Sequence, residues 1–153
     1  MAGICLLAQA CQGPLTPSVP LQTLLDAPLV VEIDGRQYTL ETYLWRDFMP
    51  PTEPNGSPLA AVVYVTAVDG QPFPAEVGAD RLWVVNGEEV WETAFSGEQR
   101  PRDQAHLYQL EKFTAGGPKW DVGIQVEVVV RVKSATGRIQ LLRATKQLIG
   151  QTV

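Results

Sequence analysis

The sequence predicts an all-β protein, arranged as an antiparallel sandwich or barrel of about seven strands. Stretches that alternate apolar and polar residues, rich in β-branched side chains, recur along the chain and are separated by Gly- and Pro-containing turns. No long stretch shows the 3.6-residue period of a helix. Of the two architectures we favour the sandwich, with residues 29–153 as a single domain.

The clearest strand covers residues 124–133. One face of this strand would carry Ile124, Val126, Val128, Val130 and Val132, and the other face is mostly polar. Ser134 to Gly137 would form a four-residue hairpin loop, which pairs Val132 with Ile139 and Val130 with Leu141. A bulge near Leu141–Leu142 would instead turn Leu142 and Ala144 inward.

Two further hairpins are predicted earlier in the chain. Residues 29–33 and 38–45 would pair across Asp34–Gly35, with Val31 opposite Tyr38 and Leu29 opposite Leu40. The dipeptide Asn86–Gly87 predicts a second tight turn, with Trp83 opposite Val90 and Leu82 opposite Trp91.

The remaining elements are less strongly patterned. Residues 59–68 are apolar on both faces, which is typical of a central strand. Residues 107–113 favour a short strand, residues 115–120 a loop, and residues 22–25 one turn of helix.

Three features carry a resemblance to a known architecture: the Asp69–Gly70 turn after the central strand, the Trp83/Trp91 hairpin and the long final hairpin. Residues 59–149 thereby resemble the immunoglobulin-like domains of bacterial envelope proteins. The resemblance implies an antiparallel immunoglobulin-like β-sandwich. The chain lacks the Cys-Trp-Cys spacing of antibody domains, and a shared sandwich does not define an activity.

Residues 1–11 read Met-Ala-Gly-Ile-Cys-Leu-Leu-Ala-Gln-Ala-Cys, so a short apolar segment and the small Ala10 precede Cys11. This stretch resembles the end of a bacterial lipoprotein signal peptide, although no positively charged region precedes it. The resemblance implies that residues 1–11 are a signal remnant and that Cys11 is lipidated. Residues 12–28, with three prolines within seven residues, would form a tether. The alternative is a short disordered arm that carries two ordinary thiols.

Composition argues against several function classes. A net charge of −5 and a pI near 4.8 disfavour a nucleic-acid partner. No apolar run reaches the ~18 residues of a membrane span, so we expect contact with a membrane only through Cys11.

The single histidine, His106, lies in a polar segment, and we expect no catalytic site, metal or cofactor. Asp69 and Asp121 are more typical of turns than of a calcium site.

The four tryptophans, at positions 45, 83, 91 and 120, are the strongest candidates for a binding role. Most should fill the core, but Trp120 in a Gly/Pro loop and Trp45 beside Arg46 could stack on a ligand.

The sequence supports two hypotheses about function. The first is a non-enzymatic, envelope-associated or secreted interaction module with an unknown protein or glycan partner. The second is a small carbohydrate- or ligand-binding module that uses Trp120 and Trp45.

Overall fold

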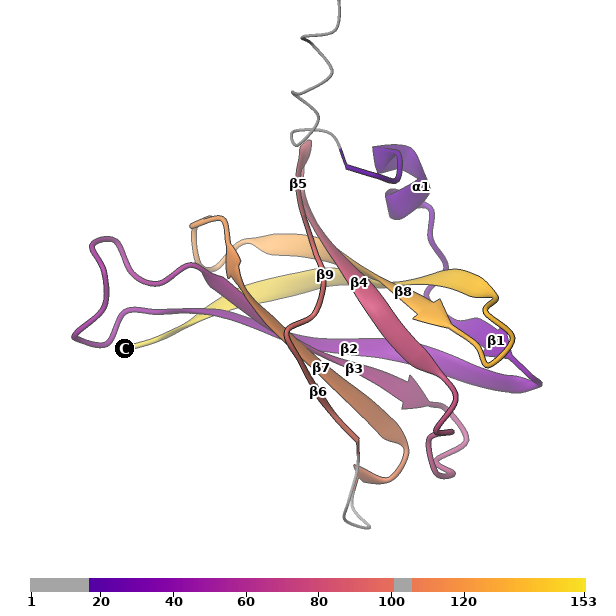
Figure 1. Cartoon of the computed structure of the whole chain (residues 1–153). Helices are drawn as coiled ribbons and strands as arrows, with labels where there is room; N and C mark the ends of the chain where they lie inside the picture. The colour runs from indigo at the N-terminus through magenta and orange to yellow at the C-terminus, as the bar shows by residue number, and fades with distance from the viewer. Residues whose placement is uncertain (1–16, 101–105) are drawn as a thin grey trace, which may run out of the picture.

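The computed structural model describes residues 17–100 and 106–153, and they are mainly β-structure (Figure 1). The prediction of an all-β protein is confirmed. The elements are α1 (Leu21–Leu25), β1 (Val31–Ile33), β2 (Arg36–Asp47), β3 (Leu59–Ala67), β4 (Gly78–Asn86), β5 (Glu89–Thr93), β6 (Gly97–Gln99), β7 (Gln109–Gly117), β8 (Gln125–Lys133) and β9 (Ile139–Thr152).

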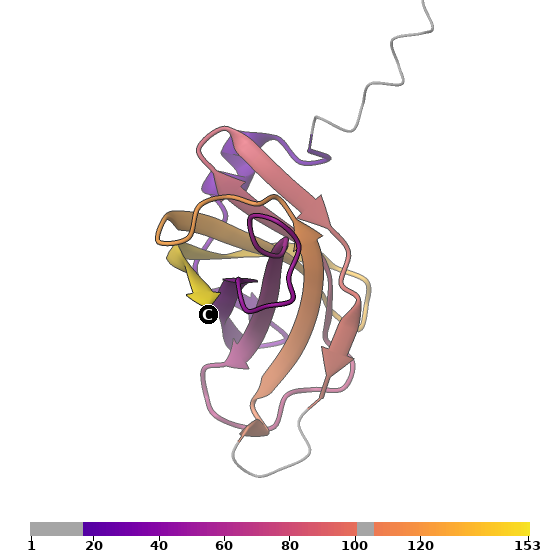
Figure 2. The same cartoon turned by 90° about the vertical axis from the view of Figure 1, so that its left-hand side faces the viewer.

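The strands in the described part of the chain belong to one sheet that curls into a half-barrel (Figure 2). Its order is β5-β4-β8-β9-β2-β3-β7-β6, with β1 paired to β2. The β2–β9 pair is parallel and its neighbours are antiparallel. The immunoglobulin-like sandwich is not confirmed, because β9 joins the two halves of the sheet instead of leaving two separate antiparallel layers.

Strand β9 changes partners shortly after a bulge. Up to Leu148 it pairs with β8, and from Ile149 to Thr152 it pairs with β2. Before the change, two β9 residues, Thr145 and Lys146, face Glu127 alone, and Lys146 has a φ of 54°. The extra residue bends the strand, so its second part runs along the other half of the sheet.

The carboxylate of Glu127 holds this bulge. It accepts hydrogen bonds from the Lys146 amide at 2.9 Å and from the Thr145 hydroxyl at 2.8 Å, and it pairs with Arg143 at 2.6 Å. Burial raises the pKa of Glu127, but these hydrogen bonds outweigh burial and place the pKa below the usual glutamate value.

The predicted register of the final hairpin is wrong. The structure pairs Lys133 with Ile139 and Val130 with Leu142, so the loop has one residue more than predicted. Leu142 and Ala144 are buried, as the alternative register required. The bulge lies at Thr145–Lys146 and not at Leu141–Leu142, because the longer loop already brings the apolar residues inward.

The inward valines of β8 are buried, as the alternation predicted. Val126, Val128, Val130 and Val132 belong to one hydrophobic cluster with the inward row of β3, which is Ala61, Val63, Val65 and Ala67. Strand β3 lies between β2 and β7, so its predicted central position is confirmed. The two halves of the curled sheet therefore share a single core.

The first two hairpins differ from prediction in detail. Val31 faces Tyr38 as predicted, but β1 begins only at Val31, and Leu29 is 45% exposed.

In the second hairpin, Val85 pairs with Val90, so the tight turn is Gly87–Glu88. Gly87 has a φ of 63° and takes the first turn position, where positive φ is required. The register of β5 on β4 differs from the predicted one by two residues. Because side chains alternate with a period of two, each side chain keeps its predicted face.

Strand β7 is longer than predicted, and its last residue lies against Trp91 of β5. The predicted strand at 107–113 is confirmed from Gln109 on, but residues 115–117, predicted as loop, continue it. A Cβ atom on Gly117 would lie 2.7 Å from the ring of Trp91 on β5. A glycine at this position therefore lets Trp91 pack across the gap between the edge strands.

The segment before β1 is packed on the domain. The single turn of helix predicted at 22–25 is confirmed as α1, and its Leu24 is buried with Trp83 and Val129 on the outer face of β4 and β8 (Figure 1). Hydrogen bonds hold both ends of the segment, from Ser18 to Glu92 and from Arg143 to the Ala27 carbonyl. Residues 17–28, which we assigned to the tether, are thus docked on the sheet.

We expect Leu24→Ala to lower the free energy of unfolding by ~2 kcal/mol or more, because it removes a buried side chain that fills the space between α1 and the sheet. The exposed neighbour provides the control, since Leu29→Ala should change stability by less than ~0.5 kcal/mol. Urea denaturation of both variants measures the difference. Equal, small effects would mean that this segment does not dock in solution.

Candidate functional site

The outer face of β2, β3 and β7 carries a group of aromatic side chains. Tyr43, Val62 and Phe113 lie side by side across the three strands, and Trp45 follows Tyr43 on the same face of β2. The Trp45 ring centroid lies 5.1 Å from that of Tyr43 and 6.4 Å from that of Phe113. We call Tyr43, Trp45, Val62 and Phe113 the aromatic patch.

The aromatic patch faces solvent. Tyr43 is 53% exposed and Phe113 is 37% exposed, while Trp45 and Val62 are half-buried. Helix α1, the only helix among residues 17–100 and 106–153, packs on the other half of the sheet. Exposed apolar side chains scattered singly are common, but a contiguous group of large aromatics on one face of a sheet is typical of an interaction surface.

A row of polar residues adjoins the aromatic patch. Glu41, Tyr64 and Glu111 lie side by side across the same three strands, two residues farther along each. We call these three residues the acidic row. Burial raises the pKa of Tyr64, and the carboxylates of Glu111 and Glu41 raise it further. Both carboxylates are therefore close enough to Tyr64 to act on it electrostatically.

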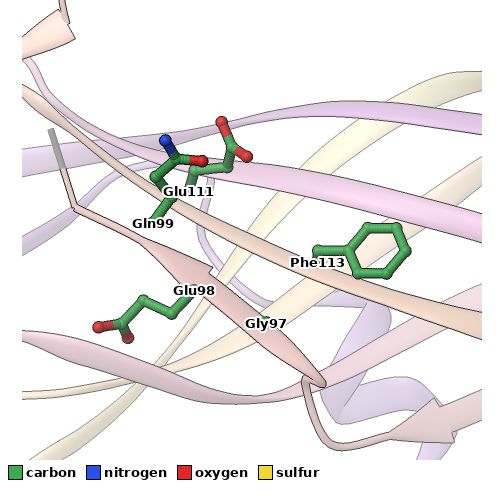
Figure 3. A pocket seen from close by; sticks show the side chains of 5 residues that line it. All are labelled: Gly97, Glu98, Gln99, Glu111 and Phe113. Atoms are coloured by element: carbon green, nitrogen blue, oxygen red, sulfur yellow. The ribbon is translucent and has the colours of Figure 1, made fainter.

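A shallow hollow of about 190 Å³ lies where the aromatic patch meets the acidic row (Figure 3). It is lined by Gly97, Glu98, Gln99, Glu111 and Phe113. Gln99 and Glu111 point to one side of the β6–β7 ribbon, and Glu98 points to the other (Figure 3). Gly97 lies opposite Phe113 and has no side chain, which leaves the Phe113 ring accessible.

The structure places the two predicted stacking residues apart. Trp45 lies in the aromatic patch. Trp120 is half-buried against the core, and its Nε1 donates a hydrogen bond to Glu89 at 3.0 Å. Trp120 therefore helps to cover the core, and it shares no surface with Trp45. Cys11, the predicted lipidation site, lies outside the described residues.

The other tryptophans fill the interior, as expected for most of the four. Trp83 is fully buried beneath α1, and Trp91 is half-buried against the core and Gly117. The sequence analysis missed Tyr43 and Phe113. Tyr43 could have been found, because it alternates with Leu44 in the same strand as Trp45. Phe113 needed the register of β7 on β3.

Arg46 has a structural role. It is 3% exposed, and its guanidinium donates hydrogen bonds to the carbonyls of Ser57 at 2.9 Å, Trp120 at 2.8 Å and Asn55. These bonds join the β2–β3 loop to the β7–β8 loop. The loops at this end of the barrel are thereby held in place beside the aromatic patch.

A second polar site, away from the aromatic patch, is the ion pair of Arg36 with Asp69. Asp69 accepts two hydrogen bonds from Arg36, each at 2.9 Å, and these hold its pKa below the usual value. A second hollow, of about 270 Å³, lies beside this ion pair. Within the described ranges, no three His, Cys, Asp or Glu residues are grouped as metal ligands, and no helix is long and apolar enough to cross a membrane.

Comparisons with protein families, with curated proteins and with solved structures found no match to this chain.

Proposed function

We propose that this protein is a non-enzymatic interaction module of a bacterial cell envelope, which binds a partner through the aromatic patch and is lipid-anchored through Cys11. The observation that carries the binding role is the exposure of Tyr43 and Phe113, with the half-buried Trp45 beside them, on a sheet face that α1 leaves uncovered. Burying such side chains against a partner is favourable, because large aromatic surfaces leave water on binding.

The scaffold suits presentation of a fixed surface. The aromatic patch lies on three hydrogen-bonded strands, and the inward side chains of the same strands belong to the shared core. The adjoining loops are held by Arg46. A partner would meet side chains already held close to their bound positions, so little ordering would oppose binding.

The docking of the N-terminal segment adds to the proposal of an anchor. Hydrogen bonds from Ser18 to Glu92, at 2.7 and 2.6 Å, fix Ser18 to the edge strand β5. Seven residues from Cys11 to Ser18 span at most ~25 Å when fully extended. A lipid on Cys11 would hold the domain close to the membrane, nearer than a tether over the whole of residues 12–28 would.

The binding role predicts cross-linking confined to one face. A photoreactive benzoylphenylalanine at position 43, in the native cells, should give a discrete cross-linked product that Trp45→Ser abolishes. The same group at position 139 is the control, since Ile139 is 50% exposed but lies at the tip of the β8–β9 hairpin. Products from both positions, or from neither, would contradict a specific interaction surface.

The anchor can be tested in the same cells by labelling with palmitate. Label should be lost in Cys11→Ala and kept in Cys5→Ala, which removes the other thiol. Label that is absent from the unaltered chain would rule out the anchor and leave the binding role untouched.

A second candidate function is carbohydrate binding, which is favoured by the position of Trp45. Its ring is tilted by 36° from Tyr43 and by 37° from Phe113, so the three rings form a shallow aromatic surface on which a sugar ring could stack. Across a panel of glycans, one should change the tryptophan fluorescence, and Trp45→Ala should abolish the change. Trp120→Phe should retain it. No change across the panel would contradict this candidate.

A further inference from the structure

The acidic row carries negative charge that no ion pair among the described residues neutralises. Within the described part of the chain, Glu111 forms no ion pair or hydrogen bond, and Glu41 accepts one bond at 3.3 Å from Thr66. Glu98, on the opposite side of β6, differs because it pairs with Lys112 at 2.9 Å and with Arg100 at 3.2 Å. Lys112 and Arg100 are thus already engaged by Glu98, and none of the cations that the structure describes pairs with Glu111.

The hollow places this charge beside an accessible aromatic ring. Phe113 and Glu111 are two residues apart on β7 and lie on the same face, so their side chains stand ~7 Å apart along the strand. Gly97 contributes no side chain over Phe113, and Gln99 adds an amide next to Glu111 (Figure 3). A ligand in this hollow would meet an apolar ring, a carboxylate and an amide oxygen together.

We propose that this hollow binds an arginine side chain from a basic segment of a partner protein, an inference that rests on the proposed interaction module. The guanidinium would stack on Phe113, donate two N–H groups to the carboxylate of Glu111 and one to the amide oxygen of Gln99. The rest of the basic segment would lie over the aromatic patch and bring further positive charge towards Glu41.

Charge distinguishes arginine from other occupants. A lysine would supply a point charge without the planar group that stacks and bonds in two directions at once. A neutral sugar would desolvate Glu111 without compensating its charge, which is costly. A second copy of the chain, docked face to face, would bring two acidic rows together. The net charge of −5 adds a long-range attraction for a basic partner.

The experiment uses the ¹⁵N-labelled full chain and the probe peptide acetyl-Gly-Arg-Gly-amide, followed by NMR chemical shifts. We expect shifts at the amides of Gly97, Gln99, Glu111 and Phe113. The lysine peptide should bind at least threefold more weakly. The citrulline peptide, which keeps the planar shape without the charge, should give no shift at these amides.

Matched variants separate this site from general attraction to an acidic protein. Glu111→Gln should weaken arginine binding at least tenfold, and Gly97→Leu should do the same by filling the space over Phe113 while leaving every charge in place. Glu88→Gln removes one charge at the β4–β5 turn, away from the hollow, and should change the affinity by less than twofold. Unchanged thermal unfolding of each variant confirms that the fold is intact.

Shifts elsewhere on the surface, equal binding of the arginine and citrulline peptides, or equal losses in Glu111→Gln and Glu88→Gln would each overturn the inference. A glycan that shifts these amides where the arginine peptide does not would overturn it as well, and would favour carbohydrate. The proposed function fails separately, through absence of the position-43 cross-link. If the arginine peptide causes no shifts but the position-43 cross-link forms, the arginine inference is wrong, and the aromatic patch binds a partner of another kind.

Discussion

The contact on which the rest of the structure depends is the one between Glu127 and the bulge in β9. The carboxylate holds Thr145 and Lys146 in a bulge that precedes the change of partner, since β9 pairs with β8 up to Leu148 and with β2 from Ile149. We expect the bend at this bulge to direct β9 towards β2 and so to join the two halves of the sheet. Arg143 extends the network to the Ala27 carbonyl, so the docked N-terminal segment is fixed to the same place.

The same geometry makes the two outer faces of the sheet unequal. The face of β4, β8 and β9 carries Trp83 and Val129, and α1 covers these side chains. The face of β2, β3 and β7 carries Tyr43, Trp45 and Phe113, and α1 does not reach it. A protein that covers one apolar face and leaves a second one exposed, beside carboxylates that form no ion pair with any described residue, has a surface suited to a partner. This surface is the basis of the proposed binding role.

The sequence predicts the faces of the strands better than their partners. The period of two placed the valines of β8 inward correctly, because burial imposes it whatever strand lies beside them. The register of the final hairpin failed by one residue, since loop length is not encoded in the alternation. The parallel pairing of β2 with β9 could not be foreseen either. It follows a bulge at Lys146, whose positive φ a lysine rarely adopts and which the hydrogen bond from its amide to Glu127 stabilises.

The candidate site was predictable only in part for the same reason. Trp45 was chosen for its position beside Arg46, and the alternation of β2, in which Leu44 is buried, puts its side chain on the outer face. Trp120 was chosen because it lies in a Gly/Pro loop, but this loop packs the half-buried ring against the core. Whether either residue stacks on a ligand stays a prediction. The acidic row and the hollow consist of residues from strands distant in sequence, and they become neighbours only through the registers of β3 and β7.

Stability as a function of pH in Glu127→Gln tests the central role of Glu127 most directly. Glutamine cannot carry the negative charge that Glu127 presents to the bulge amide and to Arg143. We therefore expect the substitution to lower the free energy of unfolding by ~1–3 kcal/mol at pH 7. The folded-state pKa of Glu127 is lowered, so the carboxylate contributes its full stability above the unfolded value of ~4.3 and loses it as pH falls further. The difference in the free energy of unfolding between Glu127→Gln and the unaltered protein should therefore be constant from pH 6 to 8. This gap should narrow below pH ~4. No gap at pH 7, or one equally wide at pH 3, would contradict the account.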